Sequence, residues 1–154
     1  MGVNGLMTAS EKCYQIVQAS EGCILAAYLC PRGIPTIGYG HTHGVALGMT
    51  CSPVQASAWL AEDLHNAEQA VHKYVKVPLS QDEFDALCSF VFNLGASSLV
   101  GTTLISLLNA GYYPAAATEM LKWCHVGKKV EPGLVIRRKR ESALFSGNPD
   151  FMEA

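Results

Sequence analysis

The stretch Glu21-Gly-Cys-Ile-Leu-Ala-Ala-Tyr-Leu-Cys30-Pro-Arg-Gly-Ile-Pro-Thr36-Ile-Gly-Tyr-Gly-His41-Thr42 is unlike the sequence on either side of it. Residues 22–48 carry six glycines and two prolines, with short apolar or aromatic runs between them. Such runs, bounded by glycine and proline, are typical of strands joined by tight turns. We therefore expect a small antiparallel β-lobe over about residues 22–50.

Helix start signals flank this stretch. In a capping box, a Ser or Thr is followed three residues later by Glu or Gln, and each side chain bonds to the backbone of the other residue. Three pairs fit the pattern: Thr8 with Glu11, Ser52 with Gln55, and Ser80 with Glu83. They predict helices over about residues 8–20, 52–73 and 80–93. Apolar periodicity and glycine stops predict three more, over 103–110, 114–123 and 134–145.

A length of 154 residues fits one compact domain and is too short for two well-filled ones. Residues 1–154 are therefore expected to form a single domain, with a β-lobe over about 22–50 and a helical lobe over about 8–21 and 52–147. The fold class is α+β: a mostly helical chain with the small sheet inserted after the first helix. A cleft between the lobes is the natural place for a site.

Composition excludes several classes of protein. Hydrophobic residues make up 49% of the chain and charged ones 16%, which allows a buried core, and the net charge of −2 gives no reason to expect nucleic acid as a partner. No apolar run approaches the roughly 18 to 20 residues of a membrane-spanning helix. The first seven residues lack the basic and apolar regions of a signal peptide. Six scattered cysteines fit no CxxC metal module, so neither a metal nor a cofactor is expected.

Glu21 is the first candidate for chemistry. It stands at the junction of the first helix and the β-lobe, and no Asp or Glu lies between it and Glu62. A carboxyl group in nearly uncharged surroundings is expected to favour its neutral form, which a general acid near neutral pH requires. The alternative is a surface glutamate at a fraying helix end.

The spacing around Glu21 resembles a known catalytic motif. Glu21, eight residues, Cys30, five residues and Thr36 match the motif of the phage lysozymes of glycoside hydrolase family 24, whose middle position holds Asp or Cys. The resemblance continues over nearly the whole chain after about Ser10, through residues 36–42, 84–95, 107–111, Trp123 and 133–145. It implies a lysozyme-like fold and an endolysin, expected to be a monomer, that hydrolyses the β-1,4 bond between N-acetylmuramic acid and N-acetylglucosamine in bacterial peptidoglycan. Such an enzyme is made in the cytoplasm of the bacterial host and acts on the cell wall after release.

The resemblance also implies roles for the three motif residues. Glu21 would protonate the leaving glycosidic oxygen, and Thr36 would orient a water molecule through its hydroxyl, unless it is only a strand residue. Cys30 stands where the family also has Asp, on the side of the sugar where a second group stabilises charge, activates water or attacks the anomeric carbon. A thiol, with a pKa of about 8.5, is mostly protonated at neutral pH. Its thiolate is a strong nucleophile and a competent base.

Further residues are carried over from the same resemblance. Thr42 and Phe92 match positions that contact the glycan, although Phe92 could equally be a core residue of its helix. His41 and Arg137 match supporting positions: His41 as a hydrogen-bonded structural residue and Arg137 as the arginine that holds the catalytic glutamate. Arg138 is the competing candidate for that arginine.

Two cysteines could regulate the site. Cys23 and Cys30 flank the short segment 24–29. If their Cα atoms came within about 4.4 to 6.8 Å, a disulfide would be geometrically possible. That bond would consume the Cys30 thiol and switch the enzyme off.

Three other functions compete with a lysozyme. A cysteine hydrolase would use Cys30 as its nucleophile with His41 or His43 as base. A zinc module would bind its metal through Cys23, Cys30, His41 and His43, although their spacing fits no common zinc pattern. A glycan-binding module without activity is the third, if the substitution to Cys30 has made the second catalytic position useless.

Overall fold

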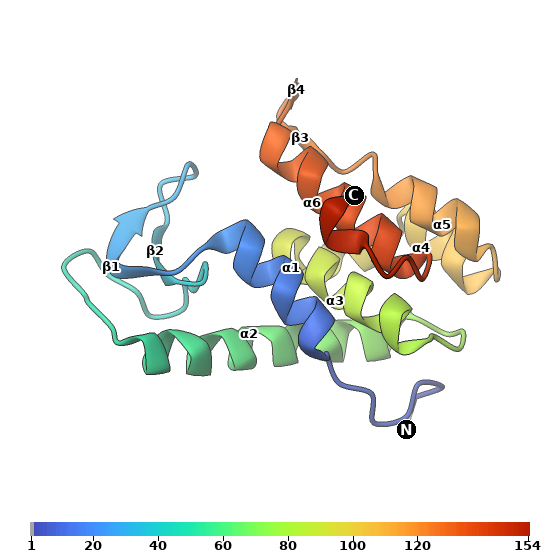
Figure 1. The fold of residues 1–154 in the computed structure, drawn as a ribbon, viewed down its shortest axis with the longest axis horizontal. Coiled ribbons are helices and arrows are strands. Elements are labelled where there is room, and N and C mark those ends of the chain that lie inside the picture. Colours follow the sequence, from blue (N-terminus) through green and yellow to red (C-terminus); the bar gives the residue numbers. More distant parts are fainter. Residues whose placement is uncertain (1) are drawn as a thin grey trace.

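The computed structural model describes residues 2–154 and confirms the α+β class (Figure 1). Helix α1 (Glu11–Glu21) leads into a two-stranded sheet of β1 (Ile24–Leu29) and β2 (Pro35–Gly38). The remaining elements are α2 (Pro53–Tyr74), α3 (Gln81–Leu94), η1 (Ala96–Leu99), α4 (Thr103–Asn109), α5 (Tyr113–Met120), β3 (His125–Val126), β4 (Lys129–Val130), α6 (Pro132–Phe145) and η2 (Phe151–Glu153). The long α2 connects the β-lobe with the helical lobe.

The β-lobe is an antiparallel hairpin with a third segment along its free edge. Tyr28 of β1 lies opposite Thr36 of β2, and residues 49–51 run along the other edge of β1. The hairpin turns where the backbone N–H of Gly33 donates to the carbonyl oxygen of Cys30 at 2.7 Å. Gly33 has a φ of +76°, a conformation that glycine adopts without steric cost. The turn therefore holds Cys30 and Arg32 at the tip of the β-lobe.

Helix α3 is the centre of the helical lobe. All eight side chains over residues 84–91 are buried, because α1, α2 and α6 pack around the helix. Its two buried polar residues have partners: Asp85 accepts the backbone N–H of Ser10 at 2.8 Å, and the Ser89 hydroxyl donates to Glu141 at 2.6 Å. The buried polar groups of α3 are thus tied to α1 and α6, which carry residues of the site.

Two of the three predicted helix caps are confirmed. Ser52 accepts the backbone N–H of Gln55 at 3.1 Å, and both bonds of the capping box at Ser80 are present. The cap predicted at Thr8 is wrong, since α1 begins after Ser10. The Ser10 hydroxyl caps nothing, because it donates to Asp85 of α3. A contact distant in sequence overrides the local signal here.

The other helix boundaries differ by a few residues. Helix α6 begins at Pro132, ahead of the predicted residue 134, because the Glu131 side chain caps the backbone N–H of Gly133. Helix α5 ends at Met120, and the chain then forms the short β3–β4 hairpin, which the sequence analysis did not predict. Among residues 2–154, no helix is both long and apolar enough to cross a membrane.

Candidate active site

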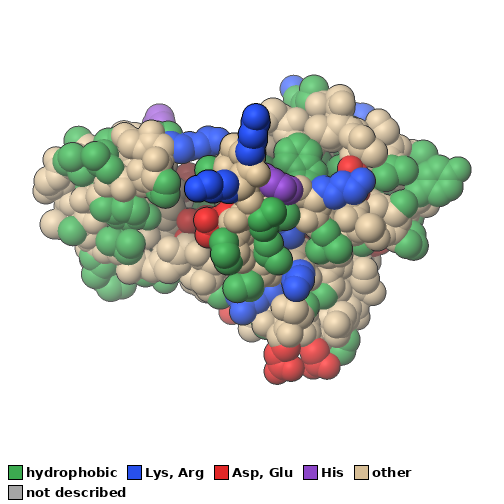
Figure 2. All heavy atoms as spheres, turned by 90° about the horizontal axis from the view of Figure 1, so that it is seen from above, with side chains coloured by type: hydrophobic (Ala, Val, Ile, Leu, Met, Phe, Trp, Pro, Cys, Tyr) green, Lys and Arg blue, Asp and Glu red, His purple; other side chains and the backbone are tan. Residues whose placement is uncertain are grey.

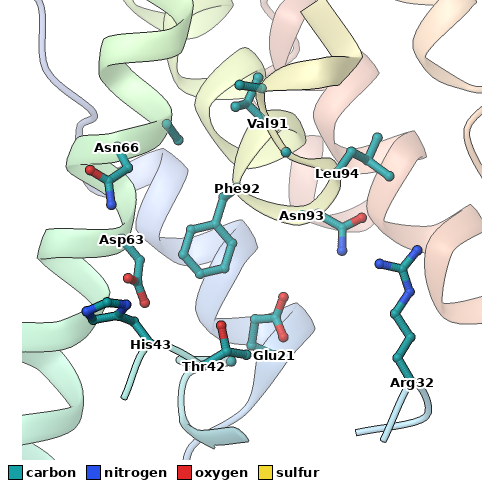
Figure 3. A pocket seen from close by; sticks show the side chains of 14 residues that line it. Glu21, Arg32, Thr42, His43, Asp63, Asn66, Val91, Phe92, Asn93 and Leu94 are labelled. Atoms are coloured by element: carbon teal, nitrogen blue, oxygen red, sulfur yellow. The ribbon is translucent and has the colours of Figure 1, made fainter. Parts of the chain in front are cut away.

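A cleft with a volume of about 610 Å³ lies between the β-lobe and the helical lobe. Figure 2 looks onto this side of the molecule, where acidic side chains lie in a hollow beside Lys and Arg side chains. The end of α1, the β-lobe loops, α2 and the end of α3 all contribute to its wall (Figure 3). Among the described residues of this wall, Glu21, Thr42 and Phe92 belong to the predicted site. Cys30 and Thr36 lie outside the wall in this conformation.

Glu21 is the last residue of α1, and its two carboxylate oxygens have different surroundings. Oε1 accepts from Nη1 of Arg137 at 2.8 Å. Oε2 faces the backbone of Gly40, where an added Cβ would lie only 2.8 Å from that oxygen. Only glycine can bring its backbone this close, and Gly40 also has a φ of +73°. One oxygen of Glu21 is therefore fixed by an arginine, and the other is left for substrate.

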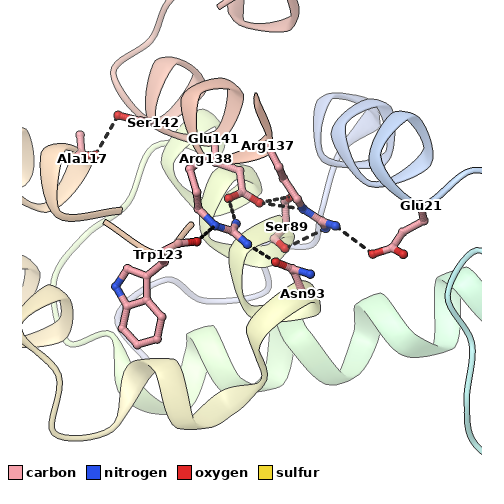
Figure 4. A network of polar contacts seen from close by, with 9 residues as sticks. All are labelled: Glu21, Ser89, Asn93, Ala117, Trp123, Arg137, Arg138, Glu141 and Ser142. Carbon is pink, nitrogen blue, oxygen red and sulfur yellow. Dashed lines mark hydrogen bonds and ion pairs between the residues drawn. The ribbon is translucent and has the colours of Figure 1, made fainter. Parts of the chain in front are cut away.

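Arg137 is held in place by buried partners (Figure 4). Its side chain is 3% exposed. Nε donates to Oε2 of Glu141 at 3.3 Å, and Nη2 donates to the carbonyl oxygen of Ser89 at 3.2 Å. Glu141 is fully buried and also accepts from the Ser89 hydroxyl. Because its donors are occupied on several sides, the guanidinium presents Nη1 to Glu21 in one orientation.

Arg138, the competing candidate, points away from Glu21. Its Nε donates to the carbonyl oxygen of Trp123 at 2.8 Å, and its other nitrogens bond to Glu141 and Asn93. Burial lowers the pKa of Arg138, and the charge of Glu141 opposes this shift. Of the two arginines, the structure brings Arg137 to Glu21.

Cys30 lies at the hairpin tip in surroundings that favour its thiolate. The backbone N–H of Ile34 lowers the pKa of the thiol most, and the backbone N–H of Arg32, the hydroxyl of Thr36 and the charge of Arg32 lower it further. Partial burial opposes them. Thr36 is 4% exposed, and its hydroxyl donates to the carbonyl oxygen of Ile34 at 2.8 Å. That hydroxyl has one hydrogen, so it can serve either Ile34 or the sulfur of Cys30.

Tyr28 connects the two parts of the motif. It lies opposite Thr36 in the hairpin. Burial raises the pKa of Tyr28, and the charges of Glu21 and Cys30 raise it further. The charges of Glu21 and Cys30 thus both act on Tyr28, although the two residues stand on different elements. No motif in the sequence singled out this tyrosine.

His41 joins the β-lobe to α2. Its ring is 5% exposed, lies 2.8 Å from Oδ2 of Asp63 through Nδ1, and stacks on Trp59 at a centroid distance of 4.7 Å. Its backbone exchanges two hydrogen bonds with Ile37, each 2.9 Å long. His41 thus occupies a structural position, and His43 lines the cleft beside it.

Gly40 and Arg32 are among the residues of the cleft wall that sequence reasoning missed. Gly40 lies in the sheet segment, and its closeness to Glu21 depends on how the chain folds. Arg32 offered a signal that was not used: it is the only Lys or Arg between Lys12 and Lys73. A single Lys or Arg in an otherwise uncharged lobe is a better candidate for a site residue than one of many charged residues on a surface.

The structure contradicts the disulfide between Cys23 and Cys30. All six cysteines are free thiols. The two residues stand before and after the extended β1 strand, and seven residue steps at about 3.3 Å each span roughly 20 Å. Disulfides need Cα atoms within about 7 Å of each other. The segment between them does not fold back, since it pairs along its length with β2 and residues 49–51.

The zinc module is not supported either. Over residues 2–154, no three His, Cys, Asp or Glu side chains are grouped so that they could hold a metal ion. The four proposed ligands are therefore not assembled. His41, which both the zinc module and the cysteine hydrolase would use, is occupied by Asp63 and Trp59.

Comparison with known proteins places this cleft in a family. The Phage lysozyme family model matches residues 18–141. An endolysin of Acyrthosiphon pisum secondary endosymbiont phage 1 is 41% identical over 143 residues, covering 90% of this chain and 98% of that relative. An endolysin of Salmonella phage P22 is 43% identical over 146 residues, covering 91% and 99%. The solved endolysin from Escherichia coli O157:H7 phage FAHEc1 superposes with a TM-score of 0.83 at 37% identity, covering 92% of this chain and 95% of that one.

Proposed function

The chain belongs to the phage lysozyme family, and from that premise we propose that Glu21 is the general acid with which it cleaves peptidoglycan. The protein is a lysozyme, a glycoside hydrolase that acts on bacterial peptidoglycan. The bond it cleaves is the β-1,4 bond between N-acetylmuramic acid and N-acetylglucosamine. A cysteine hydrolase built on Cys30 has no support among these relatives.

One observation carries the proposal: Glu21 lines the cleft with one oxygen on Arg137 and the other open beside Gly40. Because Arg137 occupies Oε1, Oε2 is the oxygen that can face a glycan strand in the cleft. Oε2 then carries the proton and gives it to the glycosidic oxygen as the C–O bond breaks. The carboxylate left behind is stabilised by Arg137, which is already in place and does not have to reorganise.

Cys30 and Thr36 act on the other side of the sugar. The surroundings of Cys30 lower the pKa of its thiol, so a larger share is thiolate than for a free cysteine at the same pH. A thiolate can stabilise the charge that develops on the sugar, take a proton from the attacking water or attack the anomeric carbon itself. Thr36 can turn its single hydroxyl hydrogen toward Ile34 or Cys30 and so leave a lone pair to orient water.

The remaining predicted residues bind or support. Thr42 and Phe92 line the cleft, where they contact the glycan strand. His41 supports the β-lobe through Asp63, and Arg137 positions Glu21. We propose that the protein works as one domain over residues 1–154, as a monomer, on the cell wall after its release from the cell that makes it.

Mass analysis of the fragments that the protein releases from purified peptidoglycan tests this function. We expect fragments whose reducing end is N-acetylmuramic acid. Fragments ending in N-acetylglucosamine, or free stem peptides, would show a different bond specificity. Binding to peptidoglycan without any release would favour the glycan-binding module instead.

A further inference from the structure

The two ends of the cleft differ in charge. Figure 3 shows Asp63, His43 and Asn66 at one end and Arg32 and Asn93 at the other, with Glu21 between them. An acidic group thus lies at one end, and Arg32, the only Lys or Arg in the cleft wall among residues 2–154, lies at the other. An elongated ligand that carries a negative charge on one side can bind in this cleft in only one favourable direction.

Arg32 is held in the cleft by the hairpin turn. Gly33 on its C-terminal side takes a φ of +76°, and the turn closes through Gly33 N–H to Cys30 at 2.7 Å and Cys30 N–H to Ile34 at 3.0 Å. Arg32 itself is exposed. Its side chain reaches into the space across from Glu21 (Figure 3). The backbone is therefore fixed while the guanidinium is open to a ligand.

The carboxyl groups of the cleft wall already have partners. Glu21 is bound by Arg137, and Asp63 is bound by His41. Within residues 2–154, the guanidinium of Arg32 has no carboxylate partner, whereas Arg137 and Arg138 both bond to Glu141. The cleft contains one cation that is ready for an anion supplied from outside.

We propose that Arg32 binds a free carboxylate of the peptide stem that muramic acid carries, and so makes the enzyme selective for stems whose carboxyl groups are not amidated. This inference rests on the proposed function, since it names the part of peptidoglycan that the site reads. The sugar rings of the strand are uncharged, and its carboxylates lie on the stems. Guanidinium groups bind carboxylates through two parallel hydrogen bonds, which fixes both position and direction.

Arg32 acts on binding and not on bond cleavage. A carboxylate held at the Arg32 end and repelled from the Asp63 end sets the direction of the strand past Glu21. Losing that contact weakens binding of substrate and transition state alike, which raises KM and leaves kcat nearly unchanged. The charge of Arg32 also lowers the pKa of Cys30. If substituting Arg32 changes activity equally on all substrates, the change is therefore attributed to Cys30. Only an effect of the Arg32 substitution that differs between substrates is attributed to binding of the peptide stem.

The test uses one preparation of peptidoglycan, stripped of other anionic wall polymers, in two forms: native, and with its stem carboxyl groups converted to amides. We expect Arg32→Gln to raise KM on native peptidoglycan about tenfold, as for the loss of a charge-assisted contact, and to change it little on the amidated form. Arg32→Lys should retain part of the preference, because it keeps the charge but loses the two-pronged geometry. Lys139→Gln, which removes one exposed positive charge on α6, is the matched control and should behave like wild type.

Two results with the Arg32→Gln variant would overturn the inference. One is an equal change on both forms of peptidoglycan, and the other is an Arg32→Gln enzyme that matches Lys139→Gln on the native form. The wild-type enzyme gives a test that needs no variant: its preference for native over amidated peptidoglycan should be present at low salt and shrink as salt rises. An enzyme that cleaves both forms equally well contradicts the role of Arg32, whereas one that releases no muramic acid ends from either form contradicts the proposed function.

Discussion

Glu21 and Cys30 stand on regions of the molecule that are held together in different ways. The region behind Glu21 is a buried network of charges, with Arg137, Arg138 and Glu141 all at most 3% exposed. The region around Cys30 is a hairpin tip held mainly by backbone hydrogen bonds. A buried ion pair holds its residues in place, because separating the partners would leave each charge buried without compensation. A backbone turn instead tolerates changes of side chain, so the second catalytic position that we propose can hold a residue such as Cys30.

Removing Glu141 should have the largest effect, because it breaks the buried network. In Glu141→Gln, Arg138 loses its carboxylate partner and Arg137 keeps only Glu21. We expect the free energy of unfolding to fall by about 3–5 kcal/mol, the usual cost of breaking a buried ion pair. Chemical denaturation measures it, with the exposed Glu153→Gln as control. A loss equal to that of the control would mean that the network contributes no stability.

Crowding Glu21 should have the next largest effect. In Gly40→Ala, the new methyl group would lie 2.8 Å from Oε2 and push the carboxyl group from its place. We expect roughly a 10²-fold loss of activity, since small displacements of a catalytic group are costly. Gly44→Ala is the matched control, because Gly44 has a similar φ of +71° and nothing within 4 Å. Both variants should lose similar stability. Equal loss of activity in the two would rule out crowding as the cause.

Substitutions at Cys30 should have a smaller effect. Cys30→Ala removes the group proposed to act opposite Glu21, and we expect activity to fall about tenfold, less than the roughly hundredfold or larger loss expected for the general acid. Cys30→Asp should preserve or raise activity, because a carboxylate is ionised at neutral pH and supplies the negative charge proposed for this position. Turbidity clearing of bacterial cells measures both. If Cys30→Ala were as active as wild type, Cys30 would be a bystander.

The smallest effect concerns the pH dependence of Cys30. Its thiol has a lowered pKa, so alkylation by iodoacetamide should become half-maximal at a lower pH than for a free cysteine. Thr36→Val removes one hydroxyl donor and should shift that midpoint upward. Cys13 and Cys88 serve as internal controls, because burial raises their pKa values and keeps them unmodified. Peptide mass mapping follows each cysteine separately. A midpoint that Thr36→Val leaves in place would exclude Thr36 as a donor to the sulfur.

The same comparison explains what could be predicted from sequence. Ser52 and Ser80 cap their own helices, and such local signals can be read directly. The helix cap predicted at Thr8 was wrong because the nearby backbone of Ser10 is bound by Asp85, which is distant in sequence. The choice between Arg137 and Arg138 stayed open because the sequence does not fix the rotation of α6 about its axis.

The predictions for the β-lobe that were wrong or missing have another cause. Cys23 and Cys30 are close in sequence, but the extended strand between them places them far apart. The sequence of this segment alone does not show whether it forms an extended strand or folds back on itself. The proximity of Gly40 to Glu21 and the direction of Arg32 depend on how the hairpin docks against the helical lobe. No local pattern contains that information.

The central claim is that Glu21 supplies the proton that breaks the glycan bond, and Glu21→Gln tests it most directly. The amide keeps the size of the side chain but cannot act as the acid. Purified peptidoglycan would be incubated with each protein, and the released N-acetylmuramic acid reducing ends would be counted by mass spectrometry. We predict a loss of at least about a hundredfold with unchanged folding and unchanged binding to peptidoglycan. A folded Glu21→Gln protein that keeps more than roughly a tenth of wild-type release, well outside the range for loss of a general acid, would contradict the account.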